Sequence, residues 1–108
     1  MRVKLITTEG VLEMLANKQK FKLVEVLPEE EFRNGHIPGA INLPLDGLQG
    51  LARKCLRKTD TIVVYCLNYQ CKASTNAART LLGMRYTKTL DYKAGKKGWL
   101  HAGFELEK

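Results

Sequence analysis

The sequence has no apolar run that approaches the ~20 residues that a helix needs to cross a bilayer. Residues 1–6 are also too short and too mixed in character to form a signal peptide. We therefore expect a cytoplasmic protein that makes no contact with a membrane. Internal repeats, linkers and low-complexity segments are lacking too, so residues 1–108 are expected to form one domain.

Cysteine is scarce, because the chain contains only Cys55, Cys66 and Cys71. In a cytoplasmic protein, these residues are expected to be reduced thiols or catalytic groups rather than structural disulfides. Neither the cysteines nor the two histidines, His36 and His101, show the paired spacing of a zinc site. We therefore expect no bound metal.

Acidic residues are outnumbered, with 18 Lys and Arg against 11 Asp and Glu and a formal net charge of +7. The basic residues are scattered, and neither interleaved aromatic side chains nor a nucleic-acid-binding motif accompanies them. We expect no nucleic-acid partner. The charge is interpreted as a source of solubility and of mild attraction for a small anion.

What the chain does contain is a regular alternation of strand and helix patterns. Strands are predicted at residues 3–6, 21–26, 40–43, 61–65 and 87–92. Helices are predicted from residue 7 or 8 to 17, from 28 to 34, and at 45–55, 73–82 and 96–101. Short connections between alternating elements favour an α/β fold, in which helices cover both faces of a parallel sheet.

The best candidate nucleophile is Cys66, which directly follows the apolar run 61–65, the expected central strand. Ligands of such sheets bind at the carboxyl ends of the strands. The loop amides and the positive end of the next helix would stabilise a thiolate there, with Lys72 adding a positive charge, so we expect a lowered pKa for Cys66. Taken alone, a small buried cysteine packed at a strand end is a slightly better explanation.

Four segments change that balance. Residues 35–44 read GHIPGAINLP, which resembles a characteristic segment of the rhodanese family. Residues 63–66, 77–82 and 92–104 resemble the family's active-site strand with its catalytic cysteine, the helix after the active-site loop, and the closing motif. The similarity runs from about residue 21 to residue 107, so the chain is identified as a member of this family.

The resemblance implies a central parallel sheet of five strands, flanked by helices on both faces. It also implies a sulfurtransferase, in which Cys66 takes sulfane sulfur from a small anionic donor such as thiosulfate. The resulting persulfide is passed to cyanide, a thiol or a protein acceptor. No metal or organic cofactor is implied, and we expect a monomer. Substrate and outer sulfur would bind to the loop that follows the nucleophile, namely Leu67, Asn68, Tyr69, Gln70, Cys71 and Lys72.

The chain departs from the family pattern at three places. Family members usually end the second strand with Asp-Val-Arg, where this chain has Glu25, Val26 and Leu27, so the arginine that ties neighbouring loops together is missing. The pair of alanines at residues 77 and 78 lies two residues further from the cysteine than in ordinary single-domain members, which makes the loop longer. The third departure is a second cysteine within that loop.

Two interpretations of this second cysteine, Cys71, remain open. It is either a resolving thiol, which attacks a persulfide on Cys66, releases sulfide and leaves a disulfide, or a residue that opens the next helix and packs there. Cys55, by contrast, is expected to be a core residue of a helix.

Two other functions also remain open. Rhodanese-like domains occur as non-catalytic or regulatory binding modules, although these commonly lack the cysteine that this chain retains. Some phosphatases share the fold but place an arginine at the position of Lys72, and an ammonium group cannot make the bidentate contact of a guanidinium with phosphate. This disfavours a cysteine-dependent phosphatase. The resemblance places His36 before a turn, where we expect it to organise structure rather than to pair with Cys66.

Overall fold

Five parallel strands form one sheet in the computed structural model. The structure describes residues 2–108, so the first residue of the domain expected over residues 1–108 lies outside the described residues. In the order β1-β5-β4-β2-β3, the strands are β1 (Lys4–Leu5), β5 (Thr89–Tyr92), β4 (Ile62–Tyr65), β2 (Lys22–Glu25) and β3 (Ile41–Asn42). Every residue of the central strand β4 is buried. The predicted five-stranded parallel α/β fold is confirmed.

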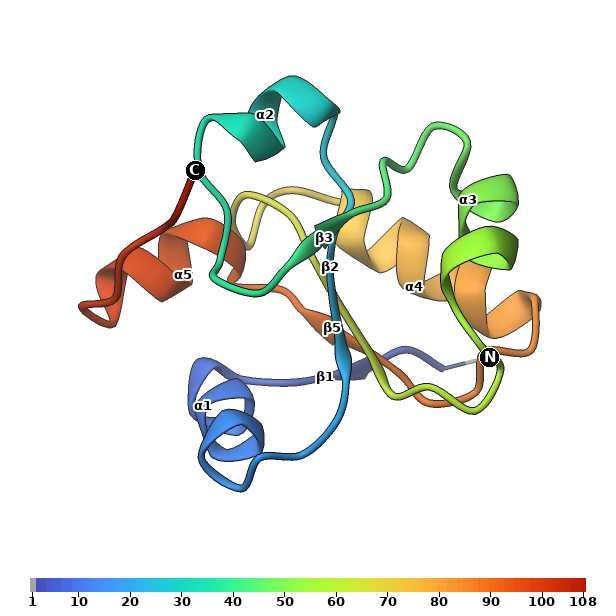
Figure 1. Cartoon of the computed structure of the whole chain (residues 1–108), viewed down its shortest axis with the longest axis horizontal. Coiled ribbons are helices and arrows are strands. Elements are labelled where there is room, and N and C mark those ends of the chain that lie inside the picture. The colour runs from blue at the N-terminus through green and yellow to red at the C-terminus, as the bar shows by residue number, and fades with distance from the viewer. Residues whose placement is uncertain (1) are drawn as a thin grey trace.

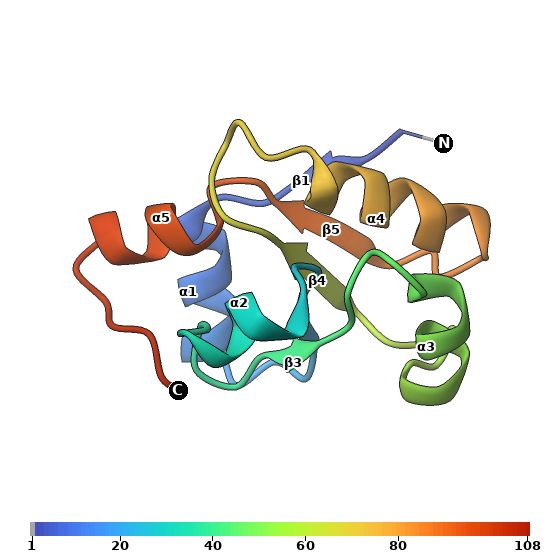
Figure 2. The ribbon, with the colours of Figure 1, turned by 90° about the horizontal axis from the view of Figure 1, so that it is seen from above.

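Helices cover both faces of this sheet, as predicted (Figure 1). They are α1 (Thr8–Ala16), α2 (Glu29–Arg33), α3 (Leu48–Cys55), α4 (Ala73–Gly83) and α5 (Gly95–His101). Figure 2 shows α1 and α5 on one side of the strands and α3 and α4 on the other. None of these helices, within residues 2–108, has the length and apolar character that a membrane span requires.

The two layers give two hydrophobic clusters because successive side chains of a strand point to opposite faces. Along β4 and just beyond it, Ile62, Val64 and Cys66 pack in the cluster that contains α3 and α4. Val63 and Tyr65 pack in the cluster that contains α1 and α5. The side chain of Cys66 therefore lies on the α4 side of the sheet.

The third helix ends at residue 55 as predicted but begins three residues later than predicted. It begins at Leu48 rather than at residue 45, because Gly47 adopts a left-handed conformation with φ of 83°. A right-handed helix cannot pass through a residue in that conformation. The expectation that Cys55 belongs to the core is wrong, since its side chain is exposed. The helix ends at Cys55, and the side chain of the next residue, Leu56, is buried instead.

Candidate active site

Cys66 lies at the carboxyl end of the central strand β4, where the start of α5 contacts the backbone. The Lys96 amide donates to the Cys66 carbonyl at 3.0 Å, and the Lys97 amide donates to the Leu67 carbonyl at 2.9 Å. Gly95 has φ of +61°, and a Cβ atom at this position would collide with the Cys66 carbonyl. The close packing of α5 therefore fixes the backbone of the expected nucleophile.

The loop after Cys66 folds back through a turn at Asn68. The Asn68 Oδ1 atom accepts hydrogen bonds from the amides of Gln70, at 3.1 Å, and Cys71, at 3.0 Å, and the Asn68 carbonyl also accepts one from the Cys71 amide. An Asn side chain that binds amides two and three residues ahead stabilises such turns. Two of the amides expected to bind the substrate are thus occupied within the loop.

This turn brings the two cysteines of the loop together. The Cys66 Sγ atom donates to the Cys71 carbonyl at 3.7 Å. Cys66 has no exposed surface, whereas Cys71 is partly exposed. One sulfur atom therefore lies in the core and its neighbour reaches the surface.

The two thiols differ in acidity, and the expectation for Cys66 is wrong. Burial raises the pKa of the Cys66 thiol, and its hydrogen bond with Cys71 raises it further. Burial also acts upward on Cys71, but the hydrogen bonds from Cys66 and the amides of Leu67 and Ala73, with the charge of Lys93, outweigh it and lower the Cys71 pKa. Of the two thiols, Cys71 is therefore the one whose surroundings favour the thiolate form.

Ser74, in the first turn of α4, is a site residue that the sequence did not single out. Its hydroxyl oxygen is buried and has no other hydrogen-bond partner among residues 2–108. Both this hydroxyl and the Ser74 amide lie beside the Cys66 sulfur and favour its thiolate form. Once a proton leaves Cys66, these two donors are in place to stabilise the charge.

A buried network on the α5 side supports the same loop. Glu25 Oε1 accepts the hydroxyl hydrogen of Tyr65 at 2.8 Å, and that hydroxyl accepts the Ile37 amide at 3.1 Å. The Lys96 ammonium lies 3.0 Å from Glu25 Oε2 and donates to the Glu31 carbonyl at 2.8 Å. Lys96 therefore connects β2, α2 and the active-site loop. This is the role that the arginine missing at position 27 has in the family pattern. Among many lysines, nothing in the sequence distinguishes it.

A basic depression of about 320 Å³ lies beside the loop, on the side of α4. Its lining consists of Lys72, Thr75, Asn76, Arg79 and Lys93. Lys93 also donates to the Tyr69 carbonyl at 3.0 Å, which holds the loop against the end of β5. The Tyr69 side chain is 58% exposed. Lys72 is thus one of three cations at a surface that suits a small anion.

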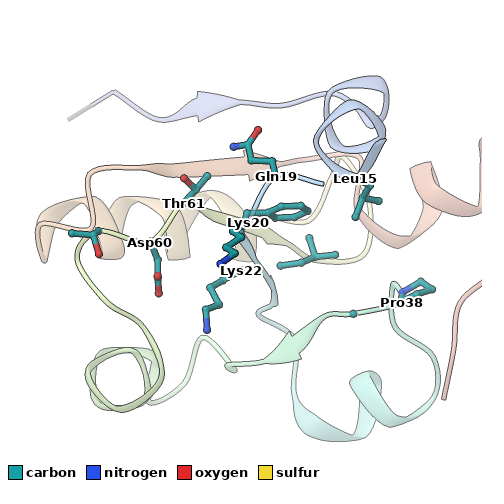
Figure 3. A pocket seen from close by; sticks show the side chains of 11 residues that line it. Leu15, Gln19, Lys20, Lys22, Pro38, Asp60 and Thr61 are labelled. Carbon is teal, nitrogen blue, oxygen red and sulfur yellow. The ribbon is translucent and has the colours of Figure 1, made fainter. Parts of the chain in front are cut away.

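Other features lie away from this site. A cavity of about 580 Å³ is found at the amino ends of β2 and β4, the edge opposite Cys66, where Figure 3 labels Leu15, Gln19, Lys20, Lys22, Pro38, Asp60 and Thr61. His36 stacks on Phe32 and has its Nδ1 atom 3.0 Å from the Phe32 carbonyl, so its contacts are structural. Within residues 2–108, His, Cys, Asp and Glu side chains form no group that could bind a metal.

Comparisons with known proteins assign the chain to a family. A family model described as the rhodanese-like domain matches residues 7–102. The HTH-type transcriptional regulator Rv0324 of Mycobacterium tuberculosis is 37% identical over 86 residues, which cover 79% of this chain and 37% of the regulator. The putative sulfur carrier protein YrkF of Bacillus subtilis is 26% identical over 94 residues, which cover 87% of this chain and 49% of that protein. The chain thus spans less than half the length of each of these two relatives.

The fold is also similar to that of a solved structure. The rhodanese-like domain of the Alr3790 protein from Anabaena sp. superimposes with a TM-score of 0.86, covering 99% of this chain and 80% of that chain. The two sequences are 22% identical, so this similarity shows the shared architecture.

Proposed function

Because the chain belongs to the rhodanese-like domain family, we propose that it is a sulfurtransferase that carries sulfane sulfur as a persulfide on Cys66. The observation that carries the proposal is the position of this cysteine, at the carboxyl end of the central strand and beside the first turn of α4. The name of YrkF, a putative sulfur carrier protein, supports the same chemistry.

The proposed cycle starts with proton transfer from Cys66. Cys71 lies next to Cys66 in the loop and, in the thiolate form that its surroundings favour, would take the proton of the Cys66 thiol, after which Ser74 would stabilise the new thiolate. This thiolate attacks the outer sulfur of thiosulfate, and sulfite leaves with the electron pair of the broken S–S bond. A nucleophilic acceptor such as cyanide then removes the outer sulfur from the persulfide and regenerates the Cys66 thiolate.

The basic depression supports an anionic donor. Three cations, Lys72, Arg79 and Lys93, surround a hollow beside the loop, and their combined field would concentrate a dianion such as thiosulfate near the cysteines. Cys66 itself has no exposed surface, so the loop over it must move to admit the donor. The conformation of the loop in this structure is therefore a closed one.

A regulatory module is the second candidate function. It is favoured by the complete burial of Cys66 and by the similarity to a protein named as a transcriptional regulator. In that case, sulfur loading would change the shape of the loop for a binding partner without continuous turnover. The two candidates differ in whether product accumulates beyond one equivalent per protein.

Thiocyanate formation from thiosulfate and cyanide is the assay that tests the proposal. With a small thiol present to keep the cysteines reduced, wild-type protein is expected to turn over repeatedly, Cys66→Ser to lose this activity, and Cys55→Ser, at an exposed cysteine away from the site, to keep it. Hydrolysis of an aryl phosphate by the same samples is the control for phosphatase activity. If folded wild type shows no turnover with cyanide or thiols, the protein is not a sulfurtransferase enzyme. If it releases phosphate rapidly in a reaction that depends on Cys66, it is a phosphatase instead.

A further inference from the structure

We propose that Cys71 resolves the persulfide on Cys66, so that the domain releases sulfide and forms an internal disulfide that external thiols must reduce. This inference rests on the proposed sulfurtransferase function and adds a second outcome to it. It is carried by the geometry of the loop, in which two of the three cysteines of the chain meet.

Proximity is the first argument. The turn at Asn68 directs the Cys71 backbone back over the strand end, where the Cys71 carbonyl lies 3.7 Å from the Cys66 Sγ atom without any rearrangement of the closed loop. The loop must open for the donor, and its closure afterwards returns Cys71 to the loaded sulfur. An intramolecular thiol held in this way reacts at a far higher effective concentration than a thiol in solution.

The ionisation of the pair is the second argument. The thiolate, not the thiol, is the nucleophile in such exchange reactions, and the amides of Leu67 and Ala73 together with Lys93 favour a thiolate on Cys71. The third cysteine, Cys55, lies at the end of α3 and is exposed, without any contact of this kind. Cys71 is thus the thiol best suited to attack a persulfide on Cys66.

The reaction balances without an oxidant. A proton passes from the Cys71 thiol to the persulfide, which gives a thiolate on Cys71 and an S–SH group on Cys66. The Cys71 thiolate attacks the Cys66 Sγ atom, the bond to the outer sulfur breaks, and the outer sulfur leaves with its electron pair as the hydrosulfide ion. The sulfane sulfur is reduced and the two cysteines are oxidised to a disulfide. Two equivalents of a small thiol then reduce this disulfide and restore both thiols.

Differences in exposure fit these two half-reactions. Cys66 is fully buried, so a persulfide formed there is shielded from acceptors in solution when the loop is closed, but not from Cys71. Cys71 is partly exposed, so an external thiol can reach its sulfur in the disulfide.

The test is a single loading reaction without reductant. Reduced, desalted protein is mixed with thiosulfate, and intact mass and released sulfide are followed together. Wild type is expected to release one sulfide per protein and to lose two hydrogens, whereas Cys71→Ser and Cys71→Ala are expected to keep one additional sulfur atom. Cys55→Ser serves as the matched control and should behave as wild type, and thermal unfolding shows that each variant is folded.

Each other outcome decides against the inference. If wild type keeps the additional sulfur as long as the Cys71 variants do, or if the disulfide formed includes Cys55, Cys71 is not the resolving thiol. If folded Cys71 variants and wild type all gain no sulfur and release no sulfide, the proposed function fails and the inference fails with it. Persulfide in the Cys71 variants therefore reports on the function, and sulfide from wild type reports on resolution.

Discussion

The ammonium group of Lys96 lies 3.0 Å from Glu25 Oε2, in an ion pair buried beneath the loop that carries Cys66. The backbone amide of the same lysine holds the Cys66 carbonyl. Burial raises the pKa of the Glu25 carboxyl, and the hydrogen bonds from Tyr65 and Lys96 oppose this effect. One residue thus neutralises a buried carboxylate and positions the nucleophile.

Replacing Lys96 by methionine is expected to destabilise the protein by roughly 3–5 kcal/mol near neutral pH, because it leaves a buried carboxylate without its partner. The loss should shrink as the pH falls toward 4.5, the ordinary value for this group. A carboxyl whose pKa is raised in the folded state contributes stability when protonated and loses it as the pH rises. Removal of Lys96 should raise the pKa of Glu25 further, so the variant loses more stability than wild type as the pH rises.

Urea denaturation of Lys96→Met across this pH range measures the effect. The double variant Lys96→Met/Glu25→Gln is the control, and it should recover part of the stability because no charge remains buried. A cost of Lys96→Met that is independent of pH would mean that the pair does not carry the stabilisation.

Alkylation by iodoacetamide should distinguish the two loop cysteines. In a Cys55→Ser background, Cys71 is expected to react first and at lower pH, because its thiolate is stabilised and its sulfur is partly exposed. Cys66→Ala removes a hydrogen bond to the Cys71 sulfur, so the midpoint of the rate profile of Cys71 should move to higher pH. Peptide mapping by mass gives both rates, and faster labelling of Cys66 would reverse the assignment of the thiolate.

Gly95 should tolerate no side chain. Alanine at either Gly95 or Gly103 adopts a left-handed backbone, at a cost of ~1–2 kcal/mol, but only the Cβ atom at Gly95 meets the Cys66 carbonyl. Gly95→Ala should therefore destabilise the protein by more than Gly103→Ala, and lower sulfur-transfer activity as well. Denaturation and activity measured on the two variants make the comparison, and equal effects would show that α5 does not fix the loop.

The basic depression should determine the affinity for anionic donors. Arg79→Gln is expected to raise the half-saturating thiosulfate concentration several-fold and to weaken its dependence on ionic strength, because one of three converging cations is removed. Lys20→Met, at the cavity on the opposite edge of the sheet, is the control for net charge alone. Equal effects of the two changes would show that the depression does not bind or attract the anionic donor.

The alternation of strand and helix patterns predicts the sheet and the position of Cys66, because these depend on local periodicity and on the order of elements. The acidity of Cys66 could not be predicted in this way. Its pKa depends on how deeply the loop closes and on which amides turn inward, and the side chain of Asn68 occupies two of them. Asn68 is a turn signal in the sequence, because an Asn side chain often binds amides two and three residues ahead, and it indicates that these two amides bond within the loop.

The contribution of Lys96 and Ser74 could not be predicted either, since both depend on contacts between distant parts of the chain. Lys96 contacts Glu25, which lies in another layer and 71 positions earlier in the sequence (96 − 25). Ser74 is marked only by its place in the first turn after the loop. Cys71, in contrast, is recognisable in the sequence as an unusual second cysteine, although only the structure places its carbonyl 3.7 Å from the Cys66 sulfur.

The location of sulfur in the loaded protein tests the central claim most directly. Cys71→Ser protein is incubated with thiosulfate, alkylated and digested, and the peptide that spans residues 59–72 is fragmented in a mass spectrometer. The account predicts one additional sulfur atom on Cys66, which disappears when cyanide is added before alkylation. Folded protein that gains no sulfur, or that carries it on Cys55, would contradict the account.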